Sequence, residues 1–187
     1  GVATRVAWDD PSMLDVTSWL PPEEAVAAER MGALIEQLHG LPRDGDAYGL
    51  VHGDAHGGNF HVDDRGRLTF FDFDDCCYAW FAHDIAMAPF YAALFRPDAP
   101  AFTDAFMRPF LRGYARENTL DPQWLSHIPD FLTLREIGIY ALIHRSYDVA
   151  DPTDGWVSMY MDGRKARIEA GAPYLDYDFA SLADVLA

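Results

Sequence analysis

The sequence predicts a mainly α-helical fold of the α+β class, with one small β-hairpin among the helices. Apolar residues recur at helical spacing over most of the chain, and two short strand-like segments flank a turn signal near residue 65. Half of the 187 residues are apolar, which is enough to bury a sizeable core. We therefore expect a single domain over residues 1–187.

The first predicted helix begins at Pro21 and ends before Gly40. Proline is tolerated in the first turn of a helix, and the early glutamates Glu23 and Glu24 suit the positive end of the helix dipole. Residues 1–20 show no clear period and are interpreted as an irregular lead-in. One face of the helix is apolar and consists of Ala27, Met31, Leu34, Ile35 and Leu38.

A β-hairpin is predicted next, from strand-like segments at 59–62 and 67–71. The cluster Asp63-Asp64-Arg65-Gly66 between them is a turn signal. If the turn is centred between Arg65 and Gly66, residue 59 lies directly opposite residue 72. We then expect the Cβ atoms of Asn59 and Asp72 to lie about 5 Å apart.

The pattern is helical again from Ala79 onward. Pro89 indicates a late start or a kink in the first of these helices. Residues 131–149 are apolar on most sides, which predicts a central, buried helix. The expected helices span residues 84–95, 101–117, 131–149, 155–170 and 179–186.

Composition argues against several partners. The chain has 30 acidic and 14 basic residues, a net charge of -16, and no basic cluster, so we expect no nucleic-acid partner. No apolar run reaches membrane-spanning length and no signal pattern opens the chain, so we expect no membrane partner. The two cysteines, Cys76 and Cys77, are adjacent, which rarely suits a disulfide. These features predict a cytoplasmic location.

The segment His52–Asp75 carries the chemistry. It contains the pattern H-x-D-x-x-x-x-N, which ends at Asn59, and a D-F-D element that begins thirteen residues later at Asp72. Phosphoryl transfer needs a carboxylate that accepts the proton of the acceptor hydroxyl, and oxygen ligands that hold Mg²⁺ against the phosphates. Asp54 is the candidate base. Asn59 and Asp72 are the candidate metal ligands, and two suffice because Mg²⁺ keeps water and phosphate oxygens as well.

The combination of HGDxHxGN, a short hairpin, FDFDD and HDIA resembles the aminoglycoside phosphotransferase and choline kinase-like superfamily, in its bacterial phosphotransferase-enzyme branch. The resemblance implies the C-terminal lobe of a protein-kinase-like fold. It also implies ATP and Mg²⁺ as cofactors, and transfer of the γ-phosphoryl group to a hydroxyl of a small molecule such as an amino-alcohol, a sugar or an aminoglycoside.

The resemblance also assigns roles to individual residues. Asp54 matches the catalytic base, and Asn59 and Asp72 match the magnesium ligands that approach the nucleotide. His52 matches the histidine that braces the metal-binding segment. Asp84 matches a structural aspartate that holds the catalytic loop.

Two more residues are candidates for supporting roles, His56 and Asp74. His56 is equally well interpreted as an ordinary loop histidine, and Asp74 as a helix-start residue. Asp74 stands where protein kinases have glycine after Asp-Phe, which argues mildly against a protein substrate.

The family pattern also includes an N-terminal lobe that grips ATP, with a lysine on the α/β-phosphates. Residues 1–51 contain no lysine and no glycine-rich fingerprint, and the single lysine of the chain is Lys165. We therefore expect a C-terminal lobe alone that is weakly active or inactive by itself. The surface left by the missing lobe should be apolar and should favour a homo-oligomer.

Two other classes of function stay open. One is a non-catalytic kinase-like binding module, against which the intact Asp54, Asn59 and Asp72 argue. The other is a metallophosphoesterase, since Gly53–Gly57 reads GDxHG. The later GNH element and the downstream metal histidines of that class have no match in the chain.

The acceptor pocket is expected in the helical region after Ala101. Trp156 and Tyr160 are candidate walls, although such residues are more often surface or core. The acidic candidates for contact with an amine are Asp148, Asp151 and Asp154.

Overall fold

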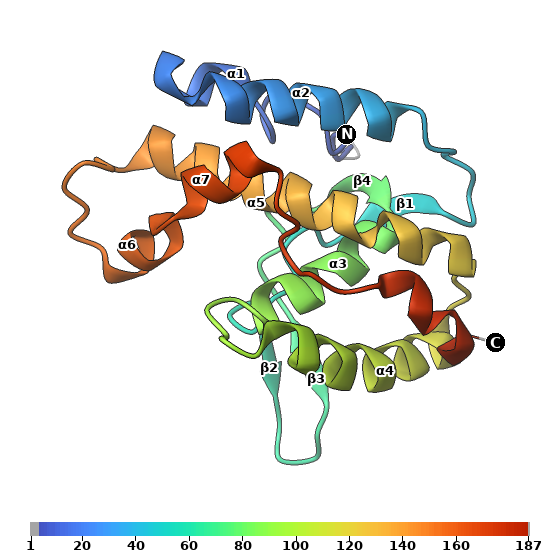
Figure 1. Cartoon of the computed structure of the whole chain (residues 1–187). Coiled ribbons are helices and arrows are strands. Elements are labelled where there is room, and N and C mark those ends of the chain that lie inside the picture. Colours follow the sequence, from blue (N-terminus) through green and yellow to red (C-terminus); the bar gives the residue numbers. More distant parts are fainter. Residues whose placement is uncertain (1–3, 187) are drawn as a thin grey trace. The chain divides into compact units, whose positions relative to one another are not determined.

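The computed structural model describes residues 4–186, which form helices and two small antiparallel sheets (Figure 1). The chain divides into two compact units. Unit 1 comprises residues up to Trp8, Pro42–Leu132 and the residues from Leu175 on. Unit 2 comprises Asp9–Leu41 and Thr133–Tyr174. The predicted mainly α fold with a small hairpin is confirmed.

A two-stranded sheet that the sequence did not predict lies in unit 1. Strand β1 (Tyr48–Val51) pairs antiparallel with β4 (Cys77–Trp80), and Val51 lies opposite Cys77. Because β1 ends where β4 begins, the loops at 52–59 and 71–76 leave the same end of this sheet. The pair therefore brings the two halves of the motif-bearing segment together.

The second sheet is the predicted hairpin, and its predicted register is wrong by one residue. Strand β2 (Phe60–Val62) pairs with β3 (Leu68–Phe70), with Phe60 opposite Phe70. Asn59 accepts a hydrogen bond from the N–H of residue 71 at 3.0 Å, so it does not lie directly opposite Asp72.

The turn explains the shift. Gly66 has φ of 74° and donates its N–H to the carbonyl of Asp63 at 2.9 Å, while Asp63 N–H donates to the carbonyl of Arg67 at 3.1 Å. Three residues, 64–66, therefore make the loop, where the prediction had two. The Asp63 carboxylate accepts the N–H groups of Arg65 and Arg67, both at 2.9 Å, which stabilises this longer turn.

The helices of unit 1 include α3 (Phe81–Ala92) and α4 (Ala99–Glu117). Helix α3 begins three residues before the predicted start, and Pro89 lies inside it, so a late start there is wrong. Its side chains are buried almost all round, including Ile85, Met87 and Phe90. Two 3₁₀ helices complete unit 1, η2 (Pro122–His127) and η3 (Phe179–Val185).

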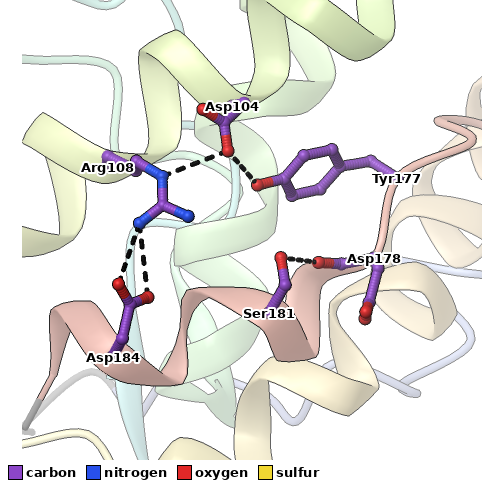
Figure 2. A network of polar contacts seen from close by, with 6 residues as sticks. All are labelled: Asp104, Arg108, Tyr177, Asp178, Ser181 and Asp184. Atoms are coloured by element: carbon purple, nitrogen blue, oxygen red, sulfur yellow. Dashed lines mark hydrogen bonds and ion pairs between the residues drawn. The ribbon is translucent and has the colours of Figure 1, made fainter.

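The C-terminal segment is held to helix α4 by a polar network (Figure 2). Arg108 forms ion pairs at 3.1 Å with Asp184 and with Asp104. The Tyr177 hydroxyl donates to Asp104 at 2.7 Å, and this bond lowers the pKa of Asp104. Phe179 of η3 is buried as well. The network is structural and involves no residue of the motif-bearing segment.

Unit 2 contains α1 (Val16–Trp19), η1 (Pro22–Glu24), α2 (Ala25–His39), most of α5 (Ile128–Ser146), α6 (Gly155–Met161) and α7 (Arg164–Ala170). The predicted buried helix is α5, in which Ile137 and Ala141 are at most 1% exposed. The helix predicted over 155–170 is in fact two helices. Gly163 has φ of 65° and separates them.

Candidate active site

Helix α3 holds the loop that follows strand β1. Asp84, in the first turn of α3, accepts the backbone N–H of His52 and that of Gly53, both at 2.8 Å. A carboxylate that receives two N–H donors fixes the backbone of a loop firmly. Asp84 therefore sets where residues 52–54 lie.

Gly53 is needed at its position for two reasons. Its φ is 80°, in the left-handed region that favours glycine. A Cβ at this residue would also collide with the carbonyl oxygen of Asp75. The loop at 52–59 and the segment at 71–76 therefore touch backbone to backbone at this point.

Three side chains surround the Asp54 carboxylate. The Tyr91 hydroxyl donates to Oδ1 at 2.7 Å, and the amide nitrogen of Asn59 donates to Oδ2 at 3.1 Å and to the Asp54 carbonyl at 3.0 Å. His56 Nε2 lies 3.3 Å from Oδ2. Both carboxylate oxygens are thus oriented by side-chain donors, and Asp54 remains half-buried.

The contacts of His56 define its tautomer. Its Nδ1 accepts the N–H of Gly58 at 2.9 Å, so in the neutral ring the proton lies on Nε2, which faces Asp54. The His56 ring also packs on the ring of Tyr91, with centroids 4.6 Å apart. His56 and Tyr91 therefore act as one support for the carboxylate.

His52 links the two halves of the segment. Its Nε2 donates to the carbonyl of Phe71 at 3.2 Å, and its ring packs on Phe73 with centroids 4.7 Å apart. His52 Nδ1 is buried and has no hydrogen-bond partner among residues 4–186. The imidazole is therefore a brace between the loop and the D-F-D element.

Two oxygen-bearing groups could hold a divalent metal. The Asn59 side-chain nitrogen donates to Asp54, so its amide oxygen is the atom that could bind a metal. The exposed Asp72 carboxylate makes no hydrogen bond within the described part of the chain, and its φ of 62° turns the backbone out of the strand. Strained backbone of this kind concentrates at functional sites. An amide oxygen and a carboxylate fit Mg²⁺ with water and phosphate completing its shell.

Asp74 is exposed, and its backbone carbonyl accepts a hydrogen bond from Arg5 at 3.2 Å. Within residues 4–186 no three His, Cys, Asp or Glu side chains gather as a metal cluster, as a metallophosphoesterase centre would require. The same residues contain no helix that is long and apolar enough to cross a membrane.

Apolar side chains are exposed around the site, on β1, on β4 and at residues 71 and 73. Leu50 and Tyr78 are cross-strand partners and are 54% and 44% exposed. Phe71 and Phe73 are 47% and 46% exposed. That these side chains belong to the surface left by a missing lobe, and that the surface favours self-association, both stay predictions.

Two tyrosines differ from expectation, and one candidate aspartate, Asp154, has a structural contact. Tyr91 was missed, although its spacing carried a signal, because it lies seven residues after Asp84 and so shares its face of α3. Tyr160 is not a pocket wall, since it is fully buried and donates its hydroxyl to the carbonyl of Glu136 at 2.9 Å. Asp154 accepts the N–H of Trp156 at 2.8 Å and serves as the N-cap of α6.

Comparison with known proteins supports the kinase-like fold. A family model described as the phosphotransferase enzyme family matches residues 4–120. The amicoumacin kinase of Bacillus subtilis (strain 168) is 40% identical over 183 residues, which cover 95% of this chain and 54% of that protein. The chain thus spans about half the length of the curated relative it matches.

Solved structures agree with this. An amicoumacin kinase in complex with AMP-PNP, Ca²⁺ and Ami has a TM-score of 0.87 and 37% identity, over 96% of this chain and 54% of its own. A microcompartment-associated aminopropanol kinase has a TM-score of 0.62 at 21% identity, over 88% of this chain and 53% of its own, and shows the fold alone. The predicted resemblance and the kinase-like fold are confirmed.

Proposed function

The chain belongs to the phosphotransferase enzyme family, and from that premise we propose that it takes part in transfer of the γ-phosphoryl group of ATP to a hydroxyl group of a small molecule. The observation that carries the proposal is the Asp54 carboxylate, which Tyr91, Asn59 and His56 hold by both oxygens. A base oriented in this way suits removal of a proton from an incoming hydroxyl.

In the proposed reaction the acceptor oxygen forms a bond to the γ-phosphorus while the bond from that phosphorus to the β,γ-bridging oxygen breaks. The acceptor proton passes to Asp54, and ADP leaves with the bridging oxygen. Asn59 and Asp72 would hold Mg²⁺, which neutralises charge on the phosphates when bound. Phosphoryl transfer depends on positioning, and the contacts of Asp84 and His52 supply that for the two loops.

We propose that the groups that bind the α- and β-phosphates of the nucleotide lie outside residues 1–187. The lysine that the family pattern places on the α/β-phosphates has no counterpart in the site, because Lys165 donates to Glu24 Oε1 at 2.8 Å and to the Glu23 carbonyl at 2.9 Å within unit 2. An amicoumacin kinase structure contains AMP-PNP and Ca²⁺, which supports a nucleotide and a divalent ion for this chain. Magnesium is the ion we propose.

The test is ATP-dependent phosphorylation of a panel of hydroxylated small molecules, followed by ³¹P NMR and by ADP release. Two proteins are compared, the 187-residue chain and the same chain joined to the part of the amicoumacin kinase relative that lies outside the matching region. We expect transfer by the extended protein and weak or no transfer by the chain alone. Robust turnover by the chain alone would overturn the proposal that nucleotide binding needs residues outside it.

Asp54→Asn in the extended protein should lower kcat about 10²- to 10⁴-fold, the usual contribution of a general base. The matched control is Asp64→Asn, which changes an exposed aspartate of the hairpin turn. If the Asp54 variant keeps the kcat of the control, Asp54 is not the base. Omission of Mg²⁺ should remove activity from the unmodified protein and from the control alike.

A further inference from the structure

A cavity of about 550 Å³ lies in unit 1 beside the Asp54 loop. We call it the aromatic cavity, because phenyl rings form much of its wall: Phe60 and Phe70 of the hairpin, and Phe106 and Phe110 of α4. Phe106 and Phe110 stack with centroids 5.8 Å apart, so their rings form a continuous apolar wall. A volume of this size matches pockets for small organic ligands, which are about 300–1,000 Å³.

The aromatic cavity adjoins the proposed base through two side chains, although Asp54 itself is not part of its wall. His56 and Tyr91 line it, and both contact the Asp54 carboxylate, at 3.3 and 2.7 Å. A molecule held in the cavity with its hydroxyl toward these two side chains would present that hydroxyl next to Asp54. The cavity is therefore placed for the acceptor.

Most polar groups of the wall are engaged in contacts within the protein. Asp84 receives the N–H groups of His52 and Gly53, and the Tyr114 hydroxyl oxygen accepts the side-chain N–H of Asn118 at 2.9 Å, which leaves the Tyr114 O–H as a donor for a ligand. Both nitrogens of His56 are occupied as well. A polyamine or a sugar would lose its water in this cavity and gain few hydrogen bonds in return. An aromatic or aliphatic group would give up no hydrogen bonds with water on entering the cavity.

We propose that the aromatic cavity is the acceptor site and that it selects alcohols with an aromatic or otherwise apolar body, over polar amino-alcohols and aminoglycosides. The inference rests on the proposed function, since the acceptor is defined by phosphoryl transfer. It is an alternative to the expectation that acidic residues of the later helices receive an amine, which stays a prediction.

The first experiment measures binding without nucleotide, by ligand-observed NMR on the 187-residue chain. The probes are 2-(2-naphthyl)ethanol, 1-amino-2-propanol and an aminoglycoside. We expect the naphthyl alcohol to bind at least about 10-fold more tightly than the other two, as burial of an aromatic ring predicts. Equal affinities, or tighter binding of a polar probe, would overturn the inference.

Variants locate the binding. Ala88→Phe fills the cavity and should lower affinity for the naphthyl alcohol at least about 10-fold, while the matched Ala105→Phe on the exposed side of α4 should not change it. If Ala88→Phe fails to fold, Phe110→Leu replaces it, with Phe102→Leu as control. Phe102 is on the same helix and stacks on Phe106, but does not line the cavity. Equal effects in variant and control would overturn the inference.

Turnover in the extended protein separates this inference from the proposed function. Transfer to polar alcohols that is indifferent to Ala88→Phe would overturn the acceptor site and leave the phosphotransferase function in place. Cavity-dependent binding of the naphthyl alcohol with no transfer to any alcohol would overturn the acceptor assignment together with the function. Transfer to the naphthyl alcohol that Ala88→Phe reduces and Ala105→Phe does not would support both.

Discussion

Tyr91 and Asp54 lie 37 residues apart in the sequence, and their side chains are joined by a hydrogen bond of 2.7 Å from the phenol to Oδ1 of the carboxylate. Tyr91 is on α3, and so is Asp84, which holds the backbone of the same loop at His52 and Gly53. One buried helix thus fixes both the loop and the carboxylate on it. Tyr91 is a positioning residue for the proposed base.

Tyr91→Phe removes this hydrogen bond and keeps the aromatic ring. A hydrogen bond to a charged group contributes about 1.5–3 kcal/mol, so we expect kcat of the extended protein to fall about 10- to 100-fold. The KM values for ATP and acceptor should change little, because the apolar wall remains. Steady-state kinetics on the variant measure this. Tyr147→Phe, at a residue that is 47% exposed, is the control, and an unchanged kcat in the Tyr91 variant would show that the bond does not position the base.

Gly53 and Gly66 allow a matched comparison of how much stability is lost when a side chain is added at a positive-φ glycine. Both have positive φ, 80° and 74°, but a Cβ at Gly53 collides with the Asp75 carbonyl, whereas none of the surrounding atoms lies within 4 Å of a Cβ at Gly66. Gly66→Ala should lower the free energy of unfolding by about 1–2 kcal/mol, the cost of the left-handed conformation. Gly53→Ala should lower it further by about 1 kcal/mol or more, through the collision. Urea unfolding at equilibrium measures both. Equal losses of unfolding free energy would mean that the loop shifts at Gly53 and avoids the collision without cost.

The sequence predicted the hairpin well because Asp63–Gly66 is a strong local turn signal. It failed at the register, since a two-residue and a three-residue loop use similar residues, both with Gly66 at positive φ, and differ in which residues pair across the turn. The pairing of β1 with β4 was missed for another reason. Each strand has four residues, and the partners are more than 25 residues apart, so no local pattern reports it.

The residues of the candidate site also divide into those that a local pattern predicts and those that only tertiary packing brings in. The roles of Asp54, Asn59 and Asp72 follow from spacing within one segment, and they stay predictions. Tyr91 reaches Asp54 only through the packing of α3 against the loop, which depends on tertiary structure. A residue as far along the sequence from Asp54 as Tyr91 can be found from sequence only by asking which residues share a helix face with a motif residue such as Asp84.

Lys165, the single lysine, is expected to be structural. It lies on the surface of unit 2 and bonds to Glu24, whose side chain is buried and also accepts the Tyr140 hydroxyl at 2.8 Å. Lys165→Met leaves a buried carboxylate without its cation, so we expect a lower Tm. The affinity of the extended protein for Mg-ATP should stay the same, as measured by calorimetry. A large loss of ATP affinity with an unchanged Tm would instead give Lys165 a role in nucleotide binding.

His144 should make the protein less stable in mild acid. Its Nε2 is buried and has no hydrogen-bond partner among the residues described, and burial lowers the pKa of His144 below the ordinary 6.5. The unfolded chain therefore binds this proton more readily than the folded protein, so stability falls as the pH drops through 6.5. His144→Phe keeps a ring against Tyr140, whose centroid is 4.7 Å from that of His144, and removes the titration.

We expect the loss of unfolding free energy between pH 7.5 and 5.5 to be smaller in His144→Phe than in the unmodified chain. Urea midpoints at the two pH values measure the difference. Most carboxylates stay ionised over this window, so histidines dominate it. His61→Gln, at an exposed histidine of the hairpin, is the control and should keep the pH dependence of the unmodified chain. If His144→Phe loses as much stability on acidification as that control does, the buried imidazole is not the cause.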